Sequence, residues 1–251
     1  MINRPALSQS KFAHDPTPVY FKLQKILLEQ IESGQWEPGA RISPERELAR
    51  MYAVSIGTVK KAVLNLVQQG LLYRIQGKGT FVAGTTLKRE SLRYYRLRRN
   101  LLDDEAVLKI KFIELSKRGG FHPANRQLGL RLKENLYEVK RMFFTGRKPV
   151  IYSISYLPQK MFKDLKDLTP SNFERDTLYH TLEKRYNLPT ISNHELFGAI
   201  PANREIAKML QVPVGTALLQ IEMLSFTYRQ QPYEYRLSYC VTHERKVYAE
   251  I

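Results

Sequence analysis

The chain has 251 residues, of which 43% are hydrophobic and 25% charged, and it contains 13 glycines and 13 prolines. This length suits one large or two ordinary domains, and the composition excludes disordered, collagen-like and disulfide-rich proteins. With 40 basic and 24 acidic residues the net charge is +16, which attracts polyanions such as nucleic acid or anionic membranes. No apolar run is long enough for a membrane span or a signal peptide, so we expect a cytoplasmic protein with no membrane partner. The lone Cys240 permits no internal disulfide, in keeping with a reducing compartment.

The first part of the chain predicts two helices after a polar start. Residues 1–17 lack periodicity, and we expect a flexible arm there. Apolar residues recur at helical spacing over 19–31, which predicts an amphipathic first helix. Ser43 is the expected N-cap of a short second helix, with Pro44 at its first position and its end near Tyr52.

A third helix and a hairpin complete this part. Ser55 is the expected N-cap of a helix whose residues 59–67 include one apolar stripe. Two β-prone runs follow at 71–75 and 80–82, and the glycines between them permit the positive φ angles of a tight hairpin. Three helices followed by a glycine-rich hairpin is the order of a winged helix-turn-helix domain, which we place at residues 18–84.

The rest of the chain predicts β-strands joined by short turns. Residues 85–100 are rich in lysine and arginine, and we interpret them as a basic linker or a first strand. Six β-prone runs follow, at 107–116, 136–144, 150–156, 190–200, 217–228 and 233–242, with helical patterns at 126–130, 178–186 and 204–210. Turn signals between adjacent runs favour antiparallel pairing, so we predict an α+β domain over residues 101–251.

The third helix is the first candidate for function. The N-terminal end of such a helix reaches base edges in the major groove of DNA. Here that end would present Ser55, Ile56, Gly57, Thr58, Lys60 and Lys61. Small residues allow close approach, hydroxyls serve phosphates or bases, and lysines neutralise phosphates. The alternative is an ordinary capped amphipathic helix with a solvated basic face.

The head resembles the GntR family of regulators. The matching motifs are Pro18-Val19-Tyr20, Gly34, Pro38-Gly39, Pro44-Glu45-Arg46-Glu47-Leu48-Ala49, Ser55 to Lys60, Gly70-Leu71-Leu72 and Gln76-Gly77-Lys78-Gly79-Thr80-Phe81-Val82. The resemblance implies that Arg46, the stretch 55–60 and the wing residue Gly77 approach DNA. With Lys61 on the helix and Gln76 and Lys78 in the wing, these residues form the predicted DNA-binding set.

Two departures from the GntR pattern matter. Ile56 stands where the family usually has arginine, and Gly57 stands where it has threonine or a similar residue. The usual Leu-Pro-Ser-Glu order is replaced by Ile42-Ser43-Pro44-Glu45. The DNA-binding role survives these changes, but the operator sequence cannot be transferred from relatives.

The tail resembles the UTRA effector domain of the HutC subgroup, which implies a chorismate-lyase-like fold. The matching pieces are Leu136-Tyr137-Glu138-Val139-Lys140-Arg141, Pro149, Tyr156-Leu157-Pro158, Thr177-Leu178-Tyr179, Leu182-Glu183 and Pro232-Tyr233-Glu234. In relatives that bind sugar phosphates, positions matching Arg141, Thr177, Tyr179 and Glu234 line the ligand pocket. A second arginine expected near Phe143 and an acid expected near Ser153 are absent, so the effector can differ from the familiar one.

Each effector candidate has a structural alternative. Arg141 would then only pair with a neighbouring acid, Tyr179 would be a core residue, and Glu234 would lie on a solvated strand. The five histidines show no spacing suited to a metal, and Gly77-Lys78-Gly79-Thr80 lacks the first glycine and the following helix of a phosphate-binding P-loop.

These observations favour a transcription regulator, most often a repressor, that binds double-stranded operator DNA as a homodimer. We expect it to sense a small effector, such as an anionic sugar phosphate. We expect no cofactor, no metal and no catalytic residue. The alternatives are a lyase-like enzyme, because the implied tail fold is shared with a lyase, and a nonspecific nucleic-acid-binding protein. Turnover of a bound metabolite would identify the first, and equal binding to all duplexes the second.

Overall fold

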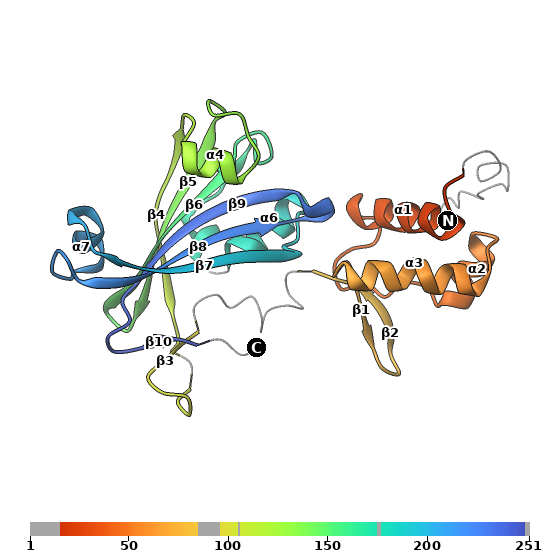
Figure 1. Ribbon diagram of the computed structural model, residues 1–251, viewed down its shortest axis with the longest axis horizontal. Helices are drawn as coiled ribbons and strands as arrows, with labels where there is room; N and C mark the ends of the chain where they lie inside the picture. The colour runs from red at the N-terminus through yellow and green to blue at the C-terminus, as the bar shows by residue number, and fades with distance from the viewer. Residues whose placement is uncertain (1–15, 85–95, 105, 175–176, 249–251) are drawn as a thin grey trace. The chain divides into compact units, whose positions relative to one another are not determined.

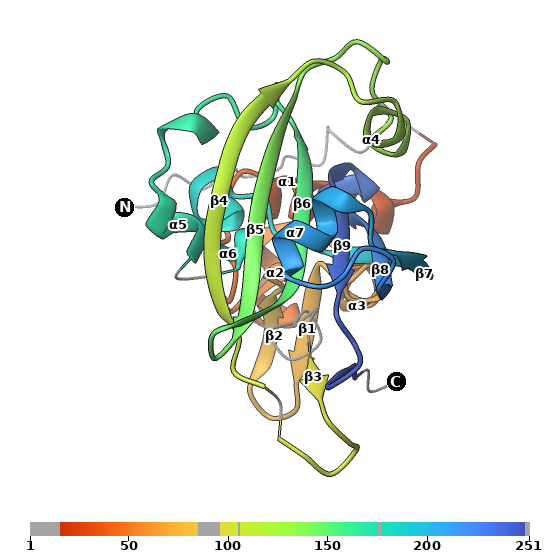
Figure 2. The ribbon, with the colours of Figure 1, turned by 90° about the vertical axis from the view of Figure 1, so that its left-hand side faces the viewer.

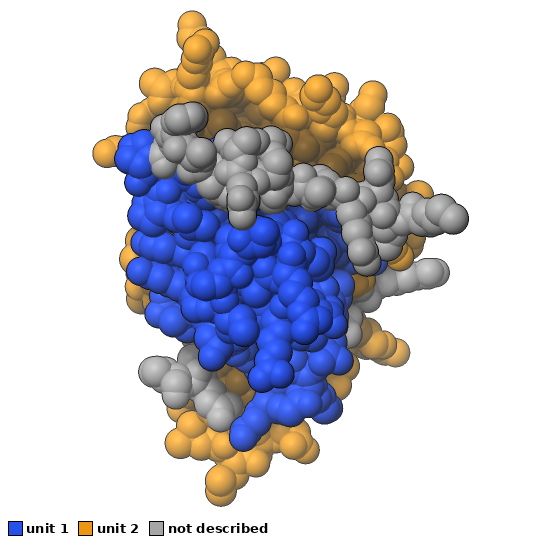
Figure 3. Space-filling view, turned by 90° about the vertical axis from the view of Figure 1, so that its right-hand side faces the viewer, with its two compact units in different colours: residues 1–87 blue, residues 88–251 orange. Residues whose placement is uncertain are grey.

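The computed structural model describes residues 16–84, 96–104, 106–174 and 177–248. The chain divides into two compact units, Met1–Leu87 and Lys88–Ile251, which are coloured separately in Figure 3. We call the first unit the head and the second unit the tail. Most of the arm expected at 1–17, and most of the linker or strand expected at 85–100, lie outside the described residues.

The head consists of three helices and a hairpin, in the predicted order (Figure 1). The elements are α1 (Val19–Glu32), α2 (Glu45–Met51), α3 (Ile56–Gln68), β1 (Leu72–Ile75) and β2 (Gly79–Val82). The predicted apolar faces of α1 and α3 are buried, and the fully enclosed side chains are Leu23, Leu27, Ile31, Val59, Ala62, Val63 and Leu66. Burying a leucine, isoleucine or valine side chain contributes about 1.5–3 kcal/mol, so this interface holds the head together.

The start of α2 differs from the prediction that Ser43 caps it. Pro44 is the N-cap, with extended backbone, and no side chain accepts a hydrogen bond from the first turn. The Pro44 carbonyl accepts the first helical bonds, from the N–H groups of Glu47 at 2.8 Å and Leu48 at 3.0 Å, so Ser43 lies one residue too early. The acidic side chains of Glu45 and Glu47 compensate, because negative charge is stabilising at a helix N-terminus.

The tail is built on a six-stranded antiparallel sheet, as the turn signals predicted. Its order is β4-β5-β6-β9-β8-β7. The strands are β4 (Lys109–Arg118), β5 (Leu136–Thr145), β6 (Lys148–Pro158), β7 (Ser192–Pro201), β8 (Ala217–Phe226) and β9 (Pro232–Cys240). A separate pair joins β3 (Leu97–Arg98) to β10 (Lys246–Val247). Each of the six predicted β runs corresponds to one strand of the sheet.

Four helices accompany the sheet: α4 (His122–Gln127), α5 (Pro170–Glu174), α6 (Leu178–Tyr186) and α7 (Arg204–Leu210), with short 3-10 turns at Leu165–Asp167 and Tyr228–Gln230. Both α6 and α7 have the predicted bounds. The prediction of a helix at 126–130 is wrong in position, since α4 begins at His122, and α5 was not predicted.

The two faces of the sheet carry separate cores. Leu178, Tyr179 and Leu182 of α6 pack with Val139 and Met223 of the sheet, and we call this side the α6 face. On the other side, the α7 face, residues of α7 pack against Met142, Tyr152, Leu218 and Tyr239, and α4 packs beside Tyr156 and Tyr235. Figure 2 shows α7 lying across this second face.

Candidate functional site

The N-terminal end of α3 is a fixed, exposed tip. The Ser55 side chain accepts a hydrogen bond from the Thr58 N–H at 3.1 Å, which confirms the predicted cap, and the two hydroxyl oxygens lie 2.8 Å apart. Ser55, Ile56 and Gly57 are exposed, and Ile56 exposes 42% of its surface although it is a large apolar residue. A Cβ added at Gly57 would meet only Ser55 Oγ, at 3.7 Å. The tip therefore combines a rigid backbone with little steric bulk.

The two lysines of α3 differ in their surroundings. Lys60 and Lys61 are both exposed. The Lys61 ammonium lies over the Tyr20 ring of α1, 4.0 Å from its centroid, in a cation–π contact. Lys61 thus contacts α1 through Tyr20, whereas Lys60 is exposed on α3.

The remaining predicted DNA-binding residues are also on the surface of the head. Arg46 is exposed on α2, and Gln76, Gly77 and Lys78 are exposed at the turn between β1 and β2. Gly77 has φ of +74°, the left-handed region that glycine tolerates, so the turn has the backbone that the sequence predicted. A tight, exposed turn with a lysine at its tip is suited to contact a phosphate backbone.

Arg41 is a further cation beside the hairpin that the sequence reading did not select. It is exposed and pairs with Phe81 of β2 through an isolated bridge, and the Ile42 N–H donates to the Thr80 carbonyl at 3.0 Å. A Cβ on Gly79 would come within 2.7 Å of Arg41 Nε, so glycine at that position lets the guanidinium lie against the strand. Only the fold brings this residue, which precedes α2, to the hairpin.

The tail contains a line of buried polar residues on the α6 face of the sheet, which we call the polar row. Its members are Arg141, Ser153, Ser155, Ser225, Glu234, Arg236 and Ser238, each no more than 3% exposed. Cross-strand pairing places Arg141 opposite Ser153, Ser153 opposite Ser238, Ser155 opposite Arg236 and Ser225 opposite Glu234. Buried charged side chains are rare unless paired or functional, so this row is the candidate effector site.

Glu234 and Arg236 form the charged centre of the polar row. Arg236 donates from Nε and Nη2 to Glu234 Oε1 at 2.8 and 2.6 Å, and its Nε also donates to Ser155 Oγ at 3.1 Å. The Arg236 guanidinium lies 4.8 Å from the centroid of the Tyr179 ring. The alternative that Glu234 lies on a solvated strand is therefore wrong.

The four predicted effector residues are only partly gathered. Tyr179 and Glu234 are both buried, and Tyr179 Oη and Glu234 Oε2 each approach Ser225 Oγ, at 3.5 and 3.4 Å. Tyr179 is at the same time a core residue. Arg141 lies on the same face but on β5, with β6 between it and Glu234. Thr177 is exposed and caps α6, accepting from the His180 N–H at 3.2 Å.

The hydroxyls and second arginine of the polar row were missed by sequence reasoning. Among the described residues, Ser153 Oγ is buried and has no hydrogen-bond partner, which leaves a polar atom to be satisfied at the centre of the sheet. A signal was present, because Ser153 and Ser155 alternate with Tyr and Ile in an otherwise apolar strand. Recognising Arg236 as their neighbour needs the strand register.

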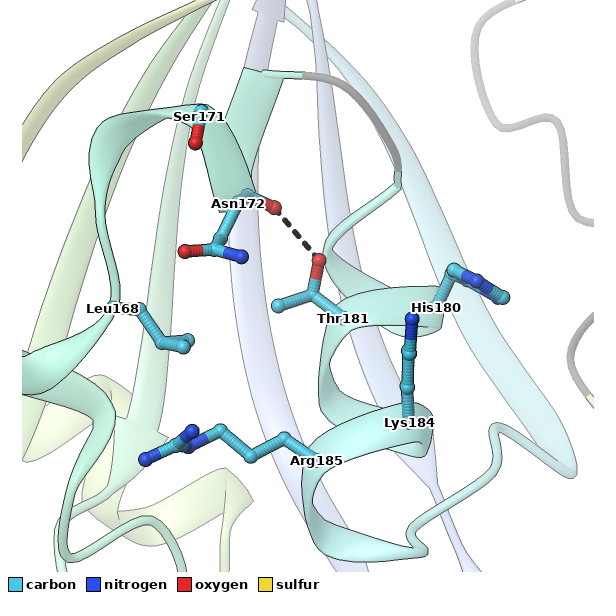
Figure 4. Close-up of a pocket in the computed structure, with 7 residues that line it drawn as sticks. All are labelled: Leu168, Ser171, Asn172, His180, Thr181, Lys184 and Arg185. Atoms are coloured by element: carbon cyan, nitrogen blue, oxygen red, sulfur yellow. Dashed lines mark hydrogen bonds between the residues drawn. The ribbon is translucent and has the colours of Figure 1, made fainter.

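A surface pocket of about 550 Å³ lies beside α6 (Figure 4). It is lined by Leu168, Ser171, Asn172, His180, Thr181, Lys184 and Arg185. Its wall is held by a hydrogen bond from Thr181 Oγ1 to the Asn172 carbonyl at 2.7 Å, and Arg185 pairs with Asp164. None of the four predicted effector residues lines this pocket, so it is a separate feature of the tail.

The chain matches two family patterns that correspond to its two units. A helix-turn-helix head and a sheet domain with a buried polar row together define a DNA-binding regulator with a sensory domain. Residues 20–82 match the gntR family of bacterial regulatory proteins, and residues 103–245 match the UTRA domain. The chain therefore belongs to the GntR family of bacterial regulators and carries a UTRA domain, as its motifs indicated.

Known relatives span almost the whole chain. It is 29% identical over 221 residues to the uncharacterized HTH-type transcriptional regulator YurK of Bacillus subtilis, covering 86% of this chain and 88% of YurK. It is 25% identical to a probable fructoselysine utilization operon transcriptional repressor of Escherichia coli K12, with 88% and 90% covered. It is also 25% identical to the histidine utilization repressor of Pseudomonas putida, with 88% and 87% covered.

The solved structure of the possible transcriptional regulator YydK from Bacillus subtilis has the same fold. The TM-score is 0.54 at 21% identity, and the alignment covers 94% of this chain and 100% of that chain. No described helix is long and apolar enough to cross a membrane. No group of three or more described His, Cys, Asp and Glu residues is placed to hold a metal ion.

Proposed function

We propose that this protein is a cytoplasmic transcriptional repressor that binds operator DNA as a homodimer and releases it when a small anionic metabolite occupies the polar row. The observation that supports it most directly is the buried pair of Arg141 and Ser153 on adjacent strands, within a regulator of the GntR family. Two relatives named as repressors support the sign of regulation.

DNA recognition is assigned to the tip of α3, Arg46 and the wing. A dimer of helix-turn-helix proteins reads two half-sites about one turn of the DNA helix apart, so each operator would bind two heads. Lys60 and Lys78 neutralise phosphates, and Ile56 offers an apolar contact such as a thymine methyl. Binding should therefore weaken steeply with salt and still discriminate between sequences.

The chemistry of the polar row suits an anion that also bears hydroxyl groups. The Arg141 guanidinium can donate two parallel hydrogen bonds to a carboxylate or phosphate. The serine hydroxyls of the row can donate or accept, as hydroxyls of a sugar or hydroxy acid require. Arg141 stands where the resemblance implies a ligand-pocket arginine, and it lies opposite Ser153 in the polar row, so it is the arginine assigned to the effector.

The test is a thermal-shift screen of phosphorylated sugars, organic acids and nucleotides with the full chain. A ligand that raises the Tm of the wild type should lose its effect with Arg141→Lys, which keeps the charge but not the bidentate geometry, and with Ser153→Ala. Lys184→Ala, in the surface pocket of Figure 4, is the matched control and should retain the full shift. If Lys184→Ala lost the shift and Arg141→Lys and Ser153→Ala retained it, the effector would bind in the surface pocket and not at the polar row.

Coupling to DNA gives a second measurement. If the effector weakens operator binding by a given factor, operator DNA must weaken effector binding by the same factor. Conversion of the bound metabolite into a product would instead support a lyase-like enzyme. Equal affinity for unrelated duplexes would support a nonspecific nucleic-acid-binding protein.

A further inference from the structure

The surface pocket of Figure 4 lies on a side of α6 that does not pack on the sheet. Tyr179 and Leu182 pack against the sheet, whereas Thr181 and Lys184 line the pocket. Across the pocket from α6 lies Asn172 of α5 (Figure 4). The volume of about 550 Å³ is within the range of small-molecule sites. The pocket and the polar row thus lie on different sides of the same helix.

The side-chain amide of Asn172 is held in one orientation. Its Oδ1 accepts hydrogen bonds from the Thr169 N–H at 2.9 Å and from Thr169 Oγ1 at 2.8 Å. Thr169 Oγ1 gives its hydrogen to Asn172, so Ser171 Oγ, 2.8 Å away, is the donor in its contact with Thr169. The Asn172 Nδ2 group makes no hydrogen bond with a described residue, and in Figure 4 it lies on the α6 side of the amide. Two N–H donors are therefore directed toward α6.

Lys184 supplies a positive charge that no described acid balances. It is exposed in the last turn of α6, and it forms no ion pair with a described residue. The neighbouring Arg185 pairs with Asp164, so the charge of this arginine is balanced. None of the described residues that line the pocket is acidic. The pocket therefore has a net positive charge.

The hydrogen-bonding groups restrict what the pocket can hold. The Lys184 ammonium and the Asn172 Nδ2 group are donors only. The hydroxyl hydrogens of the wall are already used, because Thr181 Oγ1 donates to the Asn172 carbonyl at 2.7 Å and Ser171 Oγ donates to Thr169. Donors beside an unbalanced positive charge suit an anion with several acceptor oxygens. A phosphate group has both properties, and lysine binds phosphate as a point charge.

We propose that the surface pocket beside α6 binds the phosphate group of a small molecule, with Lys184 Nζ and Asn172 Nδ2 as its donors. This site is additional to the polar row and does not depend on the effector assigned there. Asn172 and Lys184 are exposed, so a phosphate group between them would stay partly solvated. Binding should therefore be weaker than at the enclosed polar row.

The first test follows the Asn172 side-chain amide by NMR in the full chain, isotopically labelled at asparagine. Its signals are identified by their loss in Asn172→Asp, which keeps an acceptor for Thr169. Inorganic phosphate added at constant ionic strength should shift these signals until they saturate. The side-chain amide of Asn203, which caps α7, is the control and should not respond. An Asn172 signal without a saturable shift would overturn the proposal.

The second test compares two lysines in matched positions. Lys184 lies in the last turn of α6 and Lys208 in the last turn of α7. Lys184→Ala should weaken phosphate binding about tenfold, the effect of losing one charge-assisted hydrogen bond, and Lys208→Ala should bind as the wild type does. Equal affinities for the two variants would remove Lys184 from the site and overturn the proposal.

Other anions identify the occupant. Sulfate, which has the same tetrahedral shape, should shift the Asn172 signals, and chloride at the same ionic strength should not. An equal response to chloride would mean general screening of charge and would overturn the site. A sugar phosphate that binds more tightly than inorganic phosphate, and that also depends on Lys184, would identify a phosphorylated metabolite as the occupant. Equal affinity would identify the free phosphate ion.

Discussion

Removing the carboxylate of Glu234 should destabilise the tail severely. Glu234 is fully buried and Arg236 is 3% exposed, and their closest atoms are 2.6 Å apart. In Glu234→Ala the Arg236 guanidinium would stay buried and would keep its hydrogen bond to Ser155 Oγ. Breaking a buried ion pair on one side costs about 3–5 kcal/mol, because the remaining charge stays desolvated after losing its hydrogen-bonded partner. At about 2–4 °C per kcal/mol for a unit of this size, the Tm of the tail should fall by roughly 6–20 °C.

Calorimetry and tryptophan fluorescence together provide the measurement. The only tryptophan, Trp36, lies in the head, so its fluorescence follows the head separately and should not change. The double variant Glu234→Leu/Arg236→Met removes both charges and should recover most of the loss, since apolar residues often replace a buried ion pair without cost. A Glu234→Ala tail within about 1 kcal/mol of the wild type would refute this reasoning, because that is no more than an exposed ion pair contributes.

Three further predictions concern single positions. A Cβ on Gly120 would stand 1.7 Å from a backbone carbonyl oxygen, so Gly120→Ala should lower the free energy of unfolding, measured in urea, by about 1–3 kcal/mol. Gly119→Ala should leave it unchanged, because a Cβ there would meet open space. Lys60→Ala should reduce the slope of log affinity against log salt by about 1 at all duplex sequences. Lys61→Ala should reduce the slope less, because the Lys61 ammonium lies over the Tyr20 ring. Equal slopes for the two variants would contradict the difference proposed between Lys60 and Lys61. Operators selected with Ile56→Arg should gain a guanine worth about 1–3 kcal/mol, and identical selections would show that position 56 does not face bases.

Elements bounded by local signals were predictable from the sequence. The bounds of α6 and α7 agree with the prediction because Thr177 and Asn203 cap their N-termini through side-chain oxygens. Asn187 and Gln211 end the two helices in the left-handed conformation. Such signals lie within a few residues of the helix that they define, so a single sequence contains them.

Features that depend on distant contacts were not predictable in the same way. Helix α4 is held by Asn125, which is buried, accepts from the Phe121 N–H at 2.7 Å and donates to the carbonyls of Arg131 and Glu134. Apolar periodicity contains no information on such a side chain, which explains the misplaced helix. In the polar row, Ser155 and Arg236 are 81 positions apart in the chain. The sequence identified Glu234 only through a resemblance. Its partner Arg236 is two residues away on the same strand, but the contact of Arg236 with Ser155 depends on the strand register.

The open surroundings of Gly57 bear on how the operator of such a protein can change over generations. A side chain at this position would make only an ordinary contact with the capping serine, and the position lies in the first turn of a helix, where glycine costs up to about 1 kcal/mol relative to alanine. Most substitutions there would leave the fold intact or strengthen it. Under the DNA-binding role proposed for this tip, a duplicated gene would need only one codon change to acquire a new DNA preference, without first gaining stability elsewhere.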